Sequence, residues 1–334
     1  MIILHHLSSY GQIAEDARRV LPGLMTWLFE YGRYAVQIFL VMAGYLAAQS
    51  LSRYANAKFS ANGLLKLVLN RYLRLFAPYA AALLFTIVCA YIARHWVSDE
   101  FVGQSETLSQ LLAHLFFIQG ILGLDSISAG AWYVAIDWQL YSVLAILFIS
   151  FPSYQALIWL ISVLAVSSLL FFNRFGDYEA YFIYFIGSYG LGALAYLASG
   201  FQDAGVRRVA KAFLILIGLI IAAASFQQIW LRNILAWSVA LALYLWGDTH
   251  YPKITSQDGL FKGIAWGSKR SYCAFLIHFA FILLANTLYI ASGMHTYESG
   301  LLAIGLMLGV VVCSTIAASY LYRWVEVPSA KLKI

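Results

Sequence analysis

Two arginines lie one helical turn apart in the segment RYLRLFAP (residues 71–78), where a long apolar run begins. Arg71 and Arg74 fall on one face of a helix, and two guanidinium groups so placed could bind a phosphate through paired hydrogen bonds. Arginines beside an apolar segment are also common anchors that fix the orientation of a membrane span. Both interpretations place the pair where a charged loop enters a helix.

Two adjacent histidines, His5 and His6, follow a short apolar stretch at the start of the chain. An imidazole titrates near neutral pH, so it suits the removal of a proton from a hydroxyl group. Adjacent helix positions diverge by about 100°, and we therefore expect one of the two to face a cavity. The alternative is a pair of interfacial histidines that are hydrogen-bonded to their neighbours.

The segment AWYVAIDWQLY (residues 131–141) carries one acid, Asp137, with Tyr133 and Tyr141 one turn away on the same helical face. Its carboxylate could orient a histidine or bind a polar acceptor, with Trp132 beside the same site. Alternatively, the two tyrosine hydroxyls satisfy a buried charge.

Two further ionisable residues lie near the C-terminal end, in SYCAFLIHF (271–279) and YRWVEVP (322–328). His278 could be a hydrogen-bonding residue inside the membrane, and Glu326 could pair with Arg323 three residues before it.

The composition indicates which elements position these residues. Of the 334 residues 62% are hydrophobic and 11% are charged, and the mean hydropathy is +0.77. These values are typical of a multi-pass membrane protein. We expect an all-α bundle of about ten transmembrane helices in a single domain, residues 1–334, without a separate soluble domain. Nine full spans are predicted at 35–51, 75–93, 132–151, 157–172, 181–198, 213–226, 231–246, 272–291 and 301–322. Residues 1–4 are expected to end a tenth span that begins upstream.

The charges and cysteines limit the remaining possibilities. Most of the 21 Lys and Arg residues fall in 53–74, 207–211, 253–270 and 323–333, which the positive-inside rule assigns to the cytoplasmic side together with both termini. The net charge of +6 fits attraction to anionic lipids, and no nucleic-acid partner is expected. Cys89, Cys273 and Cys313 lie singly in apolar segments, so we expect packing roles and neither a disulfide nor a metal site.

Taken together, six segments resemble, in order, the motifs of acyltransferase family 3, the integral membrane acyltransferases that include bacterial O-antigen and exopolysaccharide O-acetylases. The segments are His6 (or His5), QIFLVMAGYLAAQSL (37–51), RYLRLFAP (71–78), WYVAIDWQLY (132–141), SYCAFLIHF (271–279) and VEVP (325–328). Three features depart from the family pattern. Asp137 stands where a Glu is usual and Ala43 where a Ser is usual, and the arginine that precedes the family histidine by eleven residues would fall before Met1.

The resemblance implies a reaction and a role for each residue. An acyl group, most often acetyl, moves from cytoplasmic acyl-CoA, a co-substrate rather than a bound cofactor, to a hydroxyl of a glycan or lipid-linked sugar at the outer side of a bacterial-type inner membrane. His6 is the expected general base in preference to His5, because the apolar residue after it aligns with the family motif. Arg71 and Arg74 would hold the donor, and Asp137 would orient the base or the acceptor. Tyr133, Tyr141 and Trp132 would line the site, and His278 and Glu326 would support helix packing or the donor channel.

Two other classes of protein remain open at this point. A transporter or flippase would also carry arginines and histidines inside a helical bundle, although no second copy of a repeat is evident in the spans. A purely structural membrane protein would not require several ionisable groups at membrane depth.

Overall fold

A computed structural model describes residues 1–54, 60–98, 100–151, 153–248 and 259–332. Within these ranges every regular element is helical and no strand occurs, which confirms the expected all-α fold. The helices form two compact units. The first unit comprises Met1–Ala35, Tyr72–Val134 and Thr255–Lys333, and the second comprises Val36–Arg71 and Ala135–Ile254 with Ile334. The prediction of a single membrane domain stays a prediction.

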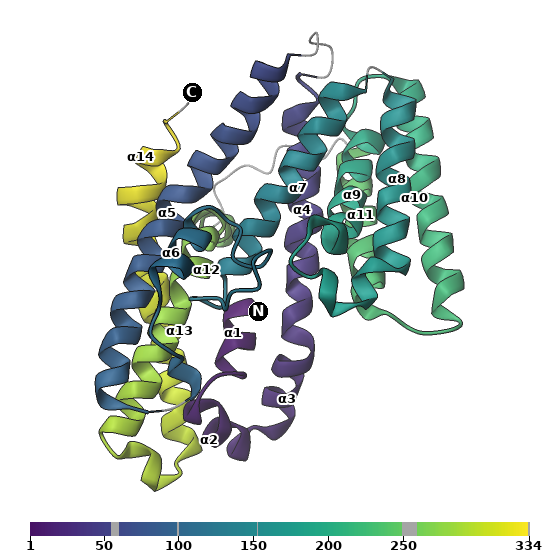
Figure 1. Cartoon of the computed structure of the whole chain (residues 1–334). Helices are drawn as coiled ribbons and strands as arrows, with labels where there is room; N and C mark the ends of the chain where they lie inside the picture. Colours follow the sequence, from purple (N-terminus) through teal and green to yellow (C-terminus); the bar gives the residue numbers. More distant parts are fainter. Residues whose placement is uncertain (55–59, 99, 152, 249–258, 333–334) are drawn as a thin grey trace. The chain divides into compact units, whose positions relative to one another are not determined.

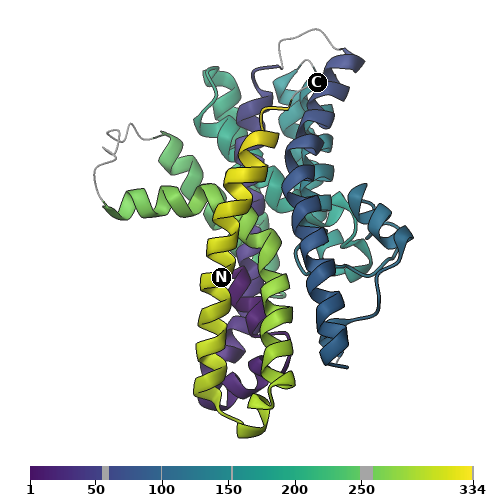
Figure 2. The same ribbon diagram turned by 90° about the vertical axis from the view of Figure 1, so that its left-hand side faces the viewer.

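The first unit is built around the hairpin of α12 (Gly259–Ala291) and α13 (Gly300–Leu321), which lie side by side (Figure 2). The N-terminal helices pack on this hairpin, and Leu7, Ile13, Met25, Tyr289 and Met307 meet in a shared core. The helix α1 therefore lies against α12 and α3. The elements of this unit are α1 (Ile2–Leu7), α2 (Gln12–Val20), α3 (Pro22–Tyr31), the 3-10 turns Gly32–Tyr34, Glu100–Val102 and Met294–Tyr297, most of α5 (Ala61–Trp96), α6 (Leu108–Leu115), α12 (Gly259–Ala291), α13 (Gly300–Leu321), the π-helical turn Tyr322–Glu326 and α14 (Val327–Ser329).

The second unit is built around α9 (Phe182–Ser199), whose side chains are mostly buried. This helix packs against α8 (Tyr154–Leu170), α10 (Ala204–Ser225) and α11 (Leu231–Asp248) (Figure 1). Small residues let α4 approach α9 closely: a Cβ atom at Gly44 would lie 1.9 Å from Tyr189 O, and one at Gly192 would lie 1.9 Å from Val41 O. The elements are α4 (Ala35–Leu51), the start of α5, most of α7 (Ala131–Ser150), α8 (Tyr154–Leu170), the 3-10 turns Phe172–Arg174 and Gly176–Tyr178, α9 (Phe182–Ser199), α10 (Ala204–Ser225) and α11 (Leu231–Asp248).

Each of the nine predicted spans coincides with a helix, but several boundaries differ. Among the described residues, eight helices are long and apolar enough to cross a membrane, and Leu231–Gly247 is a shorter apolar helix. The first of the eight runs over Pro22–Leu51 and so begins before residue 35. At the N-terminus, α1 is a helix of 6 residues.

The predicted position of the arginine pair at the entrance of a helix is wrong. The helix α5 has 36 residues and begins at Ala61, so Arg71 and Arg74 lie well inside it, and it continues through Pro78. Polar residues such as Lys66 and Asn70 lower the hydropathy before Arg71, but Leu and Lys are good helix formers, so the helix extends beyond its apolar part. Hydropathy located the apolar part of the helix and missed its start.

Between α5 and α7 lies one helix that is too short to span a bilayer, α6 (Leu108–Leu115). The helix α6 has 8 residues and begins with a capping box, in which Thr107 and Gln110 bind each other's backbone N–H groups. The basic segments predicted for the cytoplasmic side fall partly outside the described residues, at 55–59 and 249–258.

Candidate functional site

His6 and His278 form a buried pair in the first unit. The two residues are 272 positions apart, yet His6 Nδ1 lies 2.7 Å from His278 Nε2, and the rings stack at 5.0 Å between centroids with 18° between planes. His6 is 8% exposed and His278 is fully buried. The contact joins the N-terminal histidine to the segment SYCAFLIHF and brings together two residues that the sequence analysis named separately.

The hydrogen bonds around His278 determine where the protons of the neutral pair lie. His278 Nδ1 is 2.7 Å from Phe275 O, and a carbonyl oxygen can only accept, so Nδ1 carries the hydrogen. Neutral His278 then accepts at Nε2, and His6 donates from Nδ1. His6 Nε2 is left with a lone pair, and it has no hydrogen-bond partner among the described residues. The pair therefore presents one basic nitrogen.

His5 has a different environment. Its Nδ1 lies 3.1 Å from Leu28 O, and its ring lies 6.3 Å from that of Phe29. Its carbonyl oxygen accepts hydrogen bonds from the hydroxyls of Ser8 and Ser9. These contacts attach α1 to α3, and they leave His6 as the histidine that faces α12.

The segment after α1 is fastened to α12, the helix that carries His278. Asn286 Oδ1 accepts from Ile13 N at 3.0 Å. Gly11 has φ +76°, a backbone conformation that favours glycine, and a Cβ there would lie 2.3 Å from Asn286 Oδ1 and displace that side chain. Asp16 is fully buried and accepts from Tyr289 Oη at 2.8 Å. Asp16 lies in a polar stretch of the sequence, and no local pattern there predicts its burial.

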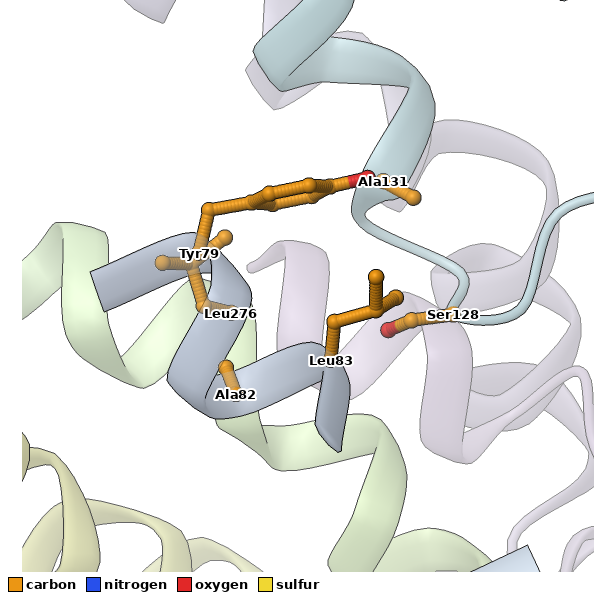
Figure 3. A pocket seen from close by; sticks show the side chains of 6 residues that line it. All are labelled: Tyr79, Ala82, Leu83, Ser128, Ala131 and Leu276. Atoms are coloured by element: carbon orange, nitrogen blue, oxygen red, sulfur yellow. The ribbon is translucent and has the colours of Figure 1, made fainter. Parts of the chain in front are cut away.

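A small cavity lies beside the histidine-bearing part of α12 (Figure 3). It has room for about one water molecule. Two hydroxyls on its wall, Tyr79 Oη and Ser128 Oγ, are buried and make no hydrogen bond with a described residue. The cavity is lined by Tyr79, Ala82 and Leu83 of α5, Ser128 of the loop before α7, Ala131 at the start of α7, and Leu276 of α12.

His114 holds the loop that carries Ser128. Its Nδ1 donates to Gln110 O at 2.8 Å and its Nε2 accepts from Ile127 N at 3.1 Å, which is the arrangement of a neutral ring. Burial lowers the pKa of His114, while the hydrogen bond to Gln110 opposes that shift. A neutral His114 therefore fixes the backbone next to Ser128.

In the second unit, Arg71 forms an ion pair with Asp137. Arg71 Nη2 and Nε lie 2.6 Å and 3.1 Å from Asp137 Oδ2, and the guanidinium carbon lies 5.1 Å from the centre of the Tyr141 ring. The side chain of Asp137 is 4% exposed and that of Arg71 is 25% exposed. Arg74, three residues along α5, is exposed and makes no hydrogen bond or ion pair with a described residue. The two arginines thus differ in their availability to a ligand.

The remaining predicted residues lie in the first unit. Tyr133 packs edge-on against Phe275, with ring centroids 5.4 Å apart, and its ring also meets that of Trp132 at 6.0 Å. Glu326 accepts a hydrogen bond from Cys273 Sγ at 2.9 Å. From the sequence, Cys273 is expected only to pack. Glu326 lies 53 positions away in the chain, and no local pattern links the two residues.

Comparison with known proteins identifies the family. A family model described as an acyltransferase domain matches residues 1–323. The chain belongs to acyltransferase family 3. Neither a curated protein nor a solved structure matches it significantly. With its apolar helices, this acyltransferase is a multi-pass membrane protein.

Three polar contacts in this family 3 acyltransferase each join two of its motif segments. His6 meets the segment that holds His278, and Arg71 of RYLRLFAP meets Asp137 of WYVAIDWQLY. Cys273 of SYCAFLIHF meets Glu326 of VEVP. The motif residues are therefore contact partners across the helices of each unit.

Proposed function

We propose that this acyltransferase transfers an acyl group, with acetyl as the first candidate, from cytoplasmic acyl-CoA to a hydroxyl group of a glycan or a lipid-linked sugar. The observation that carries the proposal is the hydrogen bond of 2.7 Å between His6 and His278. A general base needs a fixed orientation and an unprotonated nitrogen, and the contacts of His278 supply both to His6.

The chemistry follows from the free nitrogen of His6. Its Nε2 takes the proton of the acceptor hydroxyl while the oxygen attacks the carbonyl carbon of the thioester. The carbon–sulfur bond then breaks, the acyl group stays on the acceptor oxygen, and coenzyme A leaves as a thiolate. That thiolate takes up the proton held by His6, so the enzyme returns to its starting state.

Donor binding is assigned first to Arg74. Its guanidinium is exposed and has no partner among the described residues, so its donors are available to a phosphate of coenzyme A. Arg71 lies on the same helix, but Asp137 offsets its charge. We assign to Arg71 a weaker contact with the donor, through the nitrogen Nη1 that does not bond to Asp137.

The test uses membranes that contain the protein and acetyl-CoA labelled in the acetyl group. Label is expected in the glycan fraction, and His6→Gln is expected to lower the rate by about 10²- to 10⁴-fold, the usual contribution of a general base. The matched variant is His5→Gln, which changes the adjacent imidazole and is expected to keep most of the activity. If both variants transfer label at the rate of the unaltered protein, the assignment of the base is wrong.

The same experiment separates the enzyme from a transporter or flippase. A transporter would move glycan across the membrane without labelling it. Movement without label, in membranes where the protein is folded, would overturn the proposal of acyl transfer.

A further inference from the structure

Two arginines of the second unit share one tryptophan. The guanidinium carbon of Arg174 lies 5.2 Å from the centre of the Trp230 ring, and that of Arg232 lies 4.8 Å from the same centre. Arg174 ends the 3-10 turn after α8, and Trp230 and Arg232 lie at the start of α11. Two positive charges are thus held on one indole ring. Their mutual repulsion requires a compensating interaction.

The charge of this cluster is not neutralised by the described residues. None of their ion pairs includes Arg174 or Arg232. Arg232 donates from Nη1 to Tyr184 Oη at 2.7 Å and from Nη2 to Asn173 O. The nearest acid in the network is Glu179, which accepts from Tyr184 Oη at 2.9 Å and so reaches Arg232 only through that hydroxyl.

Arg174 is the more available of the two arginines. Its guanidinium makes no hydrogen bond with a described residue, and of its three nitrogens only Nε is fully buried. The two terminal nitrogens therefore present a fork of N–H donors, which matches two oxygens of a phosphate or carboxylate.

Buried polar atoms around the arginines also lack partners. Asn173 is 5% exposed, and its Oδ1 makes no hydrogen bond with a described residue, although its Nδ2 donates to Asn233 Oδ1 at 2.9 Å. Trp230 Nε1 and Arg232 Nε are likewise buried without a partner. In a native fold such groups are usually satisfied, so this cluster is poorly explained by the chain's own contacts.

The position along the spans points to the kind of anion. Arg174 is the last residue of the candidate span Tyr154–Arg174, and Trp230 immediately precedes the apolar helix that begins at Leu231. Span ends meet the zone of lipid head groups, where phosphate is the abundant anion and where tryptophan and arginine are favoured. Arg174 and Arg232 fall outside the basic segments that the positive-inside rule assigns to the cytoplasmic side, so that rule does not account for them.

We propose that Arg174 and Arg232 bind one phosphate group at the membrane boundary. Arg174 supplies a bidentate contact, and Arg232, held by Tyr184 and Asn173, supplies a fixed second charge. The phosphate comes from a phospholipid head group or from a lipid-linked acceptor, since both present the same oxygens at this depth. The site does not depend on the proposed acyl transfer, because binding requires no turnover.

The test measures lipid binding to the full-length protein in detergent by native mass spectrometry. The probes are phosphatidylglycerol, a polyprenyl phosphate, and a diacylglycerol that lacks phosphate. Both phosphate lipids are expected to bind, and the diacylglycerol is not. Tighter binding of the polyprenyl phosphate would identify the source as a lipid-linked acceptor, and tighter binding of phosphatidylglycerol would identify it as a head group.

Arg174→Gln is the decisive variant, because Arg174 makes no hydrogen bond that the fold would lose. It is expected to weaken the binding of phosphate lipids by about tenfold or more, given the strength of charge-assisted hydrogen bonds. Arg174→Lys keeps the charge and loses the two parallel N–H donors. Its affinity for phosphate lipids is expected to lie between those of the unaltered protein and Arg174→Gln. The matched control is Arg208→Gln, which removes an exposed arginine from α10 in the same unit. Two results would overturn the proposal. One is an equal affinity of Arg174→Gln and Arg208→Gln for the phosphate lipids, and the other is binding of diacylglycerol to the unaltered protein as tightly as the phosphate lipids bind.

Discussion

The histidine pair of the first unit and the Arg71–Asp137 pair of the second unit are both buried polar contacts between motif segments, but they differ in what they leave unused. Arg71 and Asp137 cancel each other's charge, with two nitrogens of Arg71 on one carboxylate oxygen. His6 and His278 share one hydrogen bond and leave Nε2 of His6 without a partner among the described residues. The ion pair of Arg71 and Asp137 can stabilise the fold. The histidine pair has a spare nitrogen, so it can also exchange a proton.

The largest expected effect is on stability and comes from breaking the ion pair of Arg71 and Asp137. Asp137→Asn removes the charge that compensates a largely buried Arg71, and breaking a buried pair in this way costs about 3–5 kcal/mol. The measurement is the free energy of unfolding of the purified protein in detergent. Arg74→Gln removes an exposed arginine from the same helix, so its effect on stability is expected to stay within about 0.5 kcal/mol.

Asp137→Glu separates charge from shape at this position. It introduces the acid that the family motif usually has at this position and keeps a carboxylate for the ion pair. The free energy of unfolding of Asp137→Glu is therefore expected to be closer to that of the unaltered protein than the value for Asp137→Asn is. If Asp137→Asn were as stable as Arg74→Gln, the ion pair would contribute nothing to the fold and the contrast between the two pairs would disappear.

A smaller effect is expected from the pair with the spare nitrogen. His278→Phe keeps a flat ring against His6 but removes the acceptor, so the hydrogen of His6 is no longer held on Nδ1. The loss of one hydrogen bond of about 1–1.5 kcal/mol corresponds to roughly a tenfold fall in kcat. The measurement is the pH dependence of kcat, which should change while KM for acyl-CoA stays the same.

The matched variant is His278→Asn, whose amide oxygen can accept from His6 and should restore part of the rate. A purely structural His278 would give a different pattern. In that case both variants would lower stability and activity together, and the pH profile would keep its shape.

The helices could be predicted from the sequence, and their contacts could not. Runs of apolar residues identified nine helices, because lipid exposure demands such runs. The starts of α5, α10 and α12 lie before the predicted spans, since hydropathy does not distinguish the polar residues of a helix from those of a loop. The partners of His6 and Arg71 are 272 and 66 residues away, and no local pattern encodes which helix faces carry them. Family motifs named the residues without pairing them.

The smallest expected effect concerns a hydroxyl outside either pair. Tyr79 Oη lines the small cavity beside α12 and makes no hydrogen bond with a described residue, so Tyr79→Phe removes no protein contact (Figure 3). Removing a buried group without a partner is expected to leave the free energy of unfolding unchanged or to raise it by up to about 1 kcal/mol.

The matched control for this change is Tyr272→Phe, which removes a hydroxyl that donates to Leu75 O at 3.0 Å between α12 and α5. It is expected to lower the free energy of unfolding by about 1 kcal/mol, the net value of one such bond. The same chemical change is therefore expected to lower the free energy of unfolding at Tyr272 and not to lower it at Tyr79. A loss at Tyr79 as large as that at Tyr272 would show that the cavity hydroxyl makes a hydrogen bond in the folded protein.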